Sequence, residues 1–183
     1  MNVLIVCGFL YLGFVYAQLL EWVIHKHLLH KLGKDRKNKF FAYHFYEHHR
    51  NSRNNLFQDE PSLKETLSII FLVIIHLPTI IISFGLYGGI VVGALRYYYV
   101  HRRAHLEPEW CKEHYPWHYA HHMATTQEMN WGVTTDKFDR LFGTRLVYVG
   151  TEKEIKDTQR RIKRFNKRRN NEQEQHIEYK RPT

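Results

Sequence analysis

Two long apolar stretches dominate the pattern of hydrophobic and polar positions. The first covers residues 3–24, is almost uninterrupted, and has the length of one membrane-spanning helix. A cleaved signal peptide is the alternative, because the sequence VYA at 15–17 resembles a small-residue cleavage site. The missing basic segment before it and an apolar pattern that continues to Ile24 favour the spanning helix.

The second apolar stretch covers residues 66–100, and its 35 residues are too many for one ordinary span. Two full spans would need about 40 residues. The segment FGLYGG at 84–89 predicts a turn near the middle, and Pro78 predicts a kink in the first arm. We therefore expect a tight helical hairpin with arms at 66–84 and 86–100, which enters and leaves the membrane on the same side.

The polar segments complete the organisation. Residues 31–53 hold seven Lys or Arg against two acids, which predicts a loop on the cytoplasmic side of the membrane. Within the polar region 107–150, the segment DKFDRLFG at 136–143 predicts a short helix. Residues 151–183 are highly charged. The prediction is a membrane domain at 1–150 and a basic, largely disordered tail at 151–183, with a surface helix at 151–170.

Histidine is the most unusual component of the chain. There are 14, and all but His76 and His176 fall in the windows 25–49 and 101–122. Clustered imidazoles are most often explained by metal ligation. Four boxes supply ten candidate ligands: His25 and His30; His44, His48 and His49; His101 and His105; His118, His121 and His122.

Helical spacing predicts how these imidazoles pair. Residues three or four apart share a helix face, so His101 is expected to pair with His105, and His44 with His48. His118 is expected to pair with His121 or His122.

Adjacent histidines point about 100° apart, so each doublet can serve two ions. His25 and His30 do not share a face on a regular helix. Either the helix breaks near His30, or His27 replaces His25.

The number and order of the boxes indicate two metal ions. Neutral imidazole suits iron, zinc, copper and nickel, and ten ligands exceed what one ion needs. The boxes lie on both sides of the apolar hairpin, and two crossings of the membrane return them to the same side. The expected fold class is therefore all-α, an integral-membrane helical bundle with a histidine-rich di-metal site facing the cytosol.

The boxes, together with NWGVTTDKFDRLFGT at 130–144, resemble the fatty acid hydroxylase and sterol desaturase superfamily over roughly residues 20–150. The resemblance implies two iron ions, for which zinc can substitute in purified protein, and dioxygen as co-substrate. It also implies a fatty acyl, sterol or carotenoid-like substrate. Electrons would come from an external donor such as cytochrome b5, or ferredoxin with a reductase. In a eukaryote the membrane would be the endoplasmic reticulum.

Alternatives remain at this stage. A lipid desaturase would use the same site, and a membrane metal transporter would also carry histidines, but along its spans. A nucleic-acid partner is disfavoured because it leaves the apolar spans unexplained. Glu21, Glu47 and Asp136 are candidates for orienting the imidazoles. His76, inside the hairpin, is expected to be a hydrogen-bonded packing residue.

Overall fold

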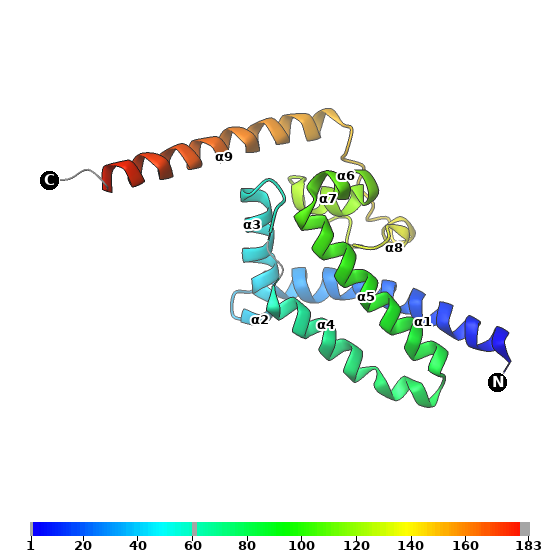
Figure 1. The fold of residues 1–183 in the computed structure, drawn as a ribbon. Coiled ribbons are helices and arrows are strands. Elements are labelled where there is room, and N and C mark those ends of the chain that lie inside the picture. The colour runs from blue at the N-terminus through cyan, green and yellow to red at the C-terminus, as the bar shows by residue number, and fades with distance from the viewer. Residues whose placement is uncertain (1, 60–61, 180–183) are drawn as a thin grey trace.

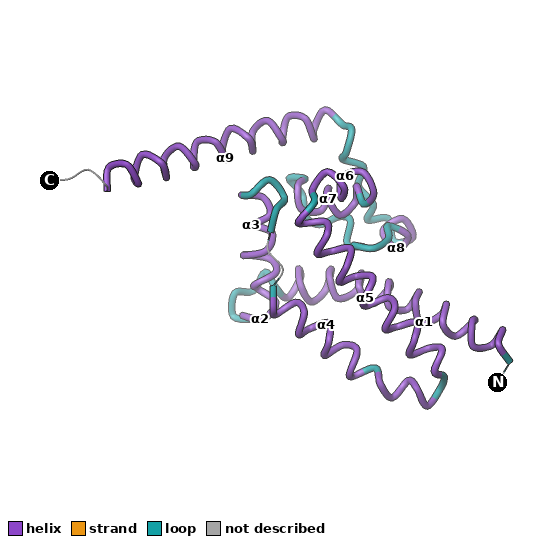
Figure 2. Tube along the Cα trace, in the orientation of Figure 1, coloured by secondary structure: helices purple, strands orange, loops and turns teal. Residues whose placement is uncertain are grey.

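The computed structural model describes residues 2–59 and 62–179, and every regular element within them is a helix (Figures 1 and 2). The long helices α1, α4 and α5 converge on a polar cap of short helices, and α9 lies on the far side of that cap from the tip of the α4–α5 hairpin (Figure 1). The predicted all-α class is confirmed for the described chain.

Two helical stretches within these residues are long and apolar enough to cross a membrane. The first joins α1 (Val3–Val23) to the π-helix η1 (Ile24–Leu32). The second joins α4 (Leu63–Ile75) to the 3₁₀-helix η3 (Leu77–Ile81), with Pro78 in the first turn of η3 where a kink was predicted. Apolar side chains stay exposed along both stretches, as lipid-facing helices require.

The α4–α5 hairpin exists, but its turn is not at the glycines. The chain turns at Ile82 and Ser83, and α5 runs over Phe84–Leu106. The Ser83 hydroxyl accepts a hydrogen bond from the Gly85 amide at 3.1 Å, which begins α5 before the glycine segment is reached. The prediction of a turn at 84–89 was therefore wrong, because the serine cap begins the helix first.

The glycines instead allow α5 to pack closely along α1. A Cβ atom on Gly89 would lie 2.0 Å from the Leu10 carbonyl oxygen, and one on Gly13 would lie 2.1 Å from that of Leu86. Small residues of this kind let two helix backbones approach within a membrane. These positions fix α5 against α1 and so set where the histidines of α5 lie.

The segment predicted as a polar loop at 31–53 is mostly helical. It contains the end of η1, then α2 (Lys39–Tyr43), the π-helix η2 (His44–His48) and α3 (His49–Asn54). The loop was predicted from the charge of the segment alone. The buried Ala42, His48, His49 and Ser52 lie on the inner faces of these helices.

The polar cap is completed by α6 (Pro108–His114), α7 (Pro116–Met123) and α8 (Lys137–Leu141). Proline stands at the start of α6 and α7, where its missing amide proton costs nothing. Residues from these helices and from the segments before and after them form a buried core that includes Phe57, Cys111, Tyr119 and Tyr148. The predicted short helix at 136–143 is confirmed as α8.

The charged C-terminal region forms one long helix, α9 (Glu152–Tyr179). The predicted surface helix is confirmed. Residues 171–179, for which disorder was predicted, continue the same helix, and residues 180–183 lie outside the described residues. Lys112 and Glu154 form an ion pair at 2.7 Å, and the Arg161 guanidinium donates to the Met123 carbonyl. These contacts join the first half of α9 to the cap.

Candidate metal centre

The ten box histidines meet at the junction of the spans and the polar cap. Nine of them form two groups, in each of which the potential ligand atoms lie within 4.8 Å of one another. The first group contains His25, His30, His44, His49 and His121. The second group contains His48, His101, His105 and His122.

The tenth histidine, His118, lies beside the second group. Its ring centroid is 4.8 Å from that of His122 and 5.1 Å from that of His101. The side chain is fully buried, and neither ring nitrogen has a hydrogen-bond partner. The pairing predicted for His118 with His122 is therefore present, and both nitrogens are available to an ion or a water.

His25 and His30 share a face because the helix changes type between them. In η1 the Gly33 amide donates to the Leu28 carbonyl, five residues earlier, at 3.2 Å. A π-helix brings residues five apart onto one side, and such turns are often found at functional sites. The helix does end near His30, at Leu32 with Gly33 as its C-cap, but the π-helical turn rather than this end brings His25 and His30 together. His27 is exposed outside both groups.

A second π-helix places His44 and His49 in the first group by the same five-residue spacing, with the His49 amide donating to the His44 carbonyl. His44 and His48, which were predicted to pair, have ring centroids 4.9 Å apart, but they belong to different groups. The doublets His48–His49 and His121–His122 each divide between the two groups. Adjacent helical side chains diverge, so a doublet can face both centres at once.

The inner nitrogens of the first group lie at short distances from one another. The Nε2 of His30 lies 3.0 Å from that of His49 and 3.1 Å from that of His121. Ligands about 2.1 Å from one ion and 90° apart would be about 3.0 Å from each other. The spacing therefore fits neighbouring ligands of a single ion.

The outer nitrogens of this group are held by the backbone. His25 Nδ1 donates to the Trp131 carbonyl at 2.6 Å, and His121 Nδ1 donates to that of Met129 at 2.7 Å. A carbonyl can only accept, so each ring keeps its lone pair on Nε2. The Gln127 side-chain amide lies 2.7 Å from His49 Nδ1. Partners of this kind fix the orientation of metal-ligating imidazoles.

The second group is oriented mainly by carboxylates. His48 Nδ1 lies 2.6 Å from Asp59, and His101 Nδ1 lies 2.5 Å from Glu65. His105 Nδ1 donates to the Phe57 carbonyl at 2.9 Å. The Nε2 atoms of His48 and His105 are buried without a hydrogen-bond partner, as are both nitrogens of His122. A buried polar atom without a partner is costly, and a metal ion would satisfy these.

His101 is an exception among these imidazoles: burial acts to lower its pKa, but the Glu65 carboxylate outweighs this and raises it. Burial keeps the other imidazoles of the two groups neutral. It lowers the pKa of His121 to about 3, and it holds the pKa values of His44, His49, His118 and His122 well below the usual range for histidine. Neutral imidazole is the form that ligates metals. The donor set and its protonation therefore fit metal ions in both groups.

A loop at 127–134 provides the carbonyls for the first group, and buried Asp139 holds that loop. The Asp139 carboxylate accepts from the Trp131 and Gly132 amides, both at 2.8 Å, and from Trp22 Nε1 at 3.1 Å. A Cβ on Gly132 would lie 2.0 Å from the Thr135 carbonyl oxygen. The close approach to Thr135 explains why a glycine stands at position 132.

The three acids expected to orient imidazoles have other partners. Glu21 accepts from the amides of Val133 and Thr134, and so braces the same loop from α1. Asp136 pairs with Arg140 and Arg145, and Glu47 is exposed. Among the described hydrogen bonds and ion pairs, none joins these three to an imidazole, so the expectation was wrong for them.

The carboxylates that do contact imidazoles belong to Asp59 and Glu65, which were not predicted from the sequence. Asp59 lies just before α4, and Glu65 lies in its first turn, at the start of the second apolar stretch. An acidic residue at the start of an apolar stretch is the sequence signal from which Asp59 and Glu65 could have been predicted. Left-handed backbone at Phe57 (φ 84°) and Asn130 (φ 59°) gave no sequence signal, although each lies at or next to a carbonyl that binds an imidazole.

An apolar cavity of about 630 Å³ lies between α1, α2, α4 and α5 and reaches the histidines. His25 and His44 of the first group and His48 of the second line one end. Leu20, Ile69, Leu72 and Val73 line its length, and His76 lies at the other end. The cavity therefore connects both histidine groups with the candidate membrane spans.

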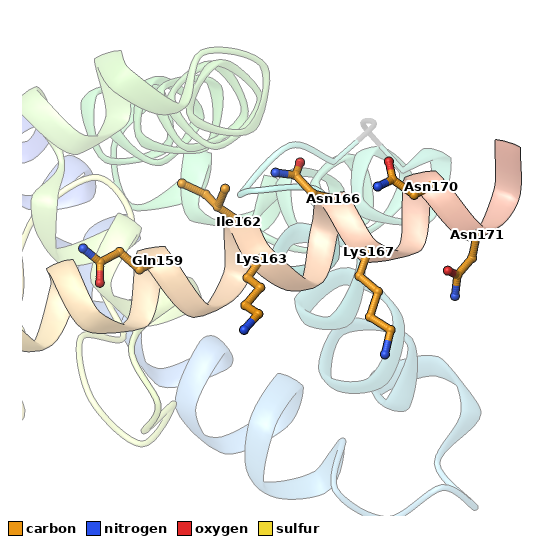
Figure 3. A pocket seen from close by; sticks show the side chains of 7 residues that line it. All are labelled: Gln159, Ile162, Lys163, Asn166, Lys167, Asn170 and Asn171. Atoms are coloured by element: carbon orange, nitrogen blue, oxygen red, sulfur yellow. The ribbon is translucent and has the colours of Figure 1, made fainter. Parts of the chain in front are cut away.

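A second depression runs along α9 and lacks such chemistry. It is lined by residues of this one helix, with Lys163 and Lys167 projecting to the same side (Figure 3). Its lining is amide, basic and aliphatic, without a carboxylate, thiol or imidazole. It is a charged surface rather than a reaction site.

Comparison with known families agrees with this geometry. A model of the fatty acid hydroxylase family matches residues 10–144, which include most of α1, the hairpin, all ten box histidines and α8. The chain belongs to the fatty acid hydroxylase family. No curated protein and no solved structure matches the chain. The family and the histidine groups together define a membrane-associated oxidoreductase with a metal-binding centre.

Proposed function

We propose that this protein is a di-iron oxygenase of the membrane that hydroxylates a C–H bond of a lipid with dioxygen. One observation carries the proposal: an apolar cavity, embedded among the candidate membrane spans, is lined at one end by histidines of both groups. A lipid chain in this cavity would present a carbon directly to the two ligand sets. The cavity size is within the range of small-molecule sites.

The ligand assignment is part of this proposal. The first ion would be held by His25, His30, His44, His49 and His121, and the second by His48, His101, His105 and His122, with His118 beside it. Five imidazoles exceed the usual three protein ligands of a catalytic zinc site, which favours iron. The irons, when bound, supply the dioxygen chemistry, since lipid carbons are inert to side-chain acids and bases.

The chain's own groups have definite roles in this reaction. Leu20, Ile69 and Leu72 hold the substrate chain and exclude water from the histidines. Asp59 and Glu65 keep His48 and His101 in fixed orientations. In the overall balance, one oxygen atom enters the substrate and the other leaves as water, with two electrons and two protons consumed.

The reaction requires a donor of two electrons. We propose an external donor such as cytochrome b5, or a ferredoxin with its reductase. Residues 158–171 contain seven Lys or Arg and no acid, which suits an acidic partner. The basic residues near the histidine end support a cytoplasmic orientation and, in a eukaryotic cell, the endoplasmic reticulum.

Lipid profiling of cells tests the function. Cells expressing the wild-type protein should contain a lipid heavier by one oxygen atom, which cells expressing His105→Ala lack. His114→Ala is the matched control, because His114 lies outside both groups and is half exposed. A product lighter by two hydrogens would assign the desaturase alternative. Identical lipids in all three strains would refute both. Metal transport is less favoured, because only His76 lies deep in a span.

A further inference from the structure

A polar pair lies deep in the apolar region, away from both histidine groups. The Tyr16 hydroxyl, from α1, is 2.9 Å from His76 Nε2, and the two rings meet edge to face with centroids 5.5 Å apart. His76 ends α4 and lines the far end of the apolar cavity. Tyr16 is nine residues before His25, so the pair lies about 14 Å along α1 from the first group.

The hydrogen bonds of this pair fix its chemical preference. His76 Nδ1 lies 2.7 Å from the Leu72 carbonyl, which can only accept, so Nδ1 carries the proton and Nε2 is an acceptor. Tyr16 supplies the proton to Nε2. The pair therefore has unused acceptor capacity on the tyrosine oxygen and has no unused donor.

We propose that Tyr16 and His76 form a hydroxyl-binding subsite, and that the substrate is a lipid carrying a hydroxyl group about 14 Å from the carbon that is attacked. This inference rests on the proposed lipid hydroxylase function. A ligand hydroxyl can donate to the Tyr16 oxygen, or it can insert between the two side chains and both donate and accept. An ether or carbonyl oxygen cannot donate, and a methyl group can do neither.

The physical basis of the selectivity is desolvation. A hydroxyl group that enters an apolar cavity without a partner loses its hydrogen bonds to water, so an apolar wall would reject it. A wall with a matching acceptor binds it and gains selectivity over analogues without the group. The remainder of the cavity between His76 and the histidines offers mainly aliphatic and aromatic contacts. His76 is thus a polar residue of the lining at that end of the cavity, and the partly exposed Tyr16 lies just behind it, with its hydroxyl 2.9 Å from His76 Nε2.

Equilibrium binding to metal-loaded protein in lipid nanodiscs, without reductant, tests the subsite separately from catalysis. The probes are 16-hydroxyhexadecanoic acid, hexadecanoic acid and 16-methoxyhexadecanoic acid, whose carboxylates stay at the membrane surface while the other end reaches into the cavity. We expect the hydroxy acid to bind roughly tenfold more tightly than the other two. Tyr16→Phe should abolish this preference, whereas Tyr11→Phe, at an exposed position of the same helix, should retain it.

The outcomes are distinct. Equal affinities for the three probes in the wild type, or a failure to bind any of them, would overturn the subsite. So would a Tyr16→Phe protein that is less stable but equally selective, because the pair would then only join two helices. Selective binding by a protein that yields no oxidised lipid would instead overturn the proposed function and leave the subsite standing.

Discussion

His25 and His30 lie five residues apart and face the same centre, with ring centroids 5.0 Å apart. On an α-helix this spacing would separate them, and the π-helix η1 brings them together. His27, three residues before His30, would have been the α-helical partner, yet it is exposed and outside the group. The helix type therefore decides which histidine can bind metal.

This relationship predicts the effect of removing each imidazole. His25→Ala should lower the iron content of the purified protein from about two ions per chain towards one, because the first group loses an inner Nε2 whose lone pair is fixed by Trp131. His27→Ala should retain the wild-type content. Plasma mass spectrometry of both variants measures this. Equal losses in the two proteins would mean that η1 does not select the ligand.

The carboxylate behind His48 predicts a second result. Asp59→Asn should weaken metal binding in the second group by about 10–100-fold, because the imidazole loses the negative charge that raises its basicity. A chelator titration measures the affinity. Asp35→Asn is the control, since the Asp35 carboxylate accepts only from the Lys37 amide in an exposed turn. If both variants released metal at the wild-type chelator concentration, the orienting role of Asp59 would be excluded.

Packing of α5 against α1 gives a prediction for neighbouring glycines. Gly89→Ala should lower the free energy of unfolding by about 1–3 kcal/mol, because its Cβ would lie 2.0 Å from the Leu10 carbonyl. A Cβ on Gly88 would meet nothing within 4 Å, so Gly88→Ala should instead raise stability by about 0.5–1 kcal/mol. Unfolding in mixed detergent micelles compares the two. Equal destabilisation would show that the close approach is not needed.

The buried imidazoles predict how stability depends on pH. Burial lowers the pKa of His121 to about 3, and those of His118 and His122 lie well below the usual value. In the unfolded chain these groups take up protons below about pH 6.5, while in the folded protein they stay neutral. The unfolded state then binds more protons, so stability present above that pH is lost as the pH falls.

We therefore expect the melting temperature of the metal-free protein to fall by several degrees between pH 7 and pH 5. Differential scanning fluorimetry in detergent measures it. The loss should be smaller in a His118→Gln/His122→Gln variant, which has fewer groups to protonate. A melting temperature that is constant or rises on acidification would contradict the neutral state assigned to the cluster.

Much of the architecture could be predicted from apolar run lengths and from the order of the boxes. The spanning helix, the hairpin, the helix α8 and the first part of α9 all follow from periodicity and composition. The hairpin turn did not, because glycine has the same sequence signature in a turn and in a close helix contact. The partner at Leu10, which lies far away in the sequence, decides between them.

The sequence predicted which histidines form the candidate site, but it did not predict how they divide into two groups. The structure gathers all ten box histidines, but the division of nine of them into two groups depends on the two π-helices, which local spacing does not reveal. The partners of the outer nitrogens were missed because several are backbone carbonyls, such as those of Phe57 and Trp131. Any residue type can provide a carbonyl, so composition carries no signal for it.

The source of the oxygen atom is the most direct test of the account. Membranes containing the wild-type protein, supplied with reductant and isotopically labelled dioxygen, should form a lipid carrying one labelled oxygen. The product should be absent in His30→Ala, which removes a ligand of the first group, and present in His27→Ala. A product whose oxygen comes from water, or a labelled product formed equally by His30→Ala, would contradict a dioxygen-activating metal centre built from these histidines.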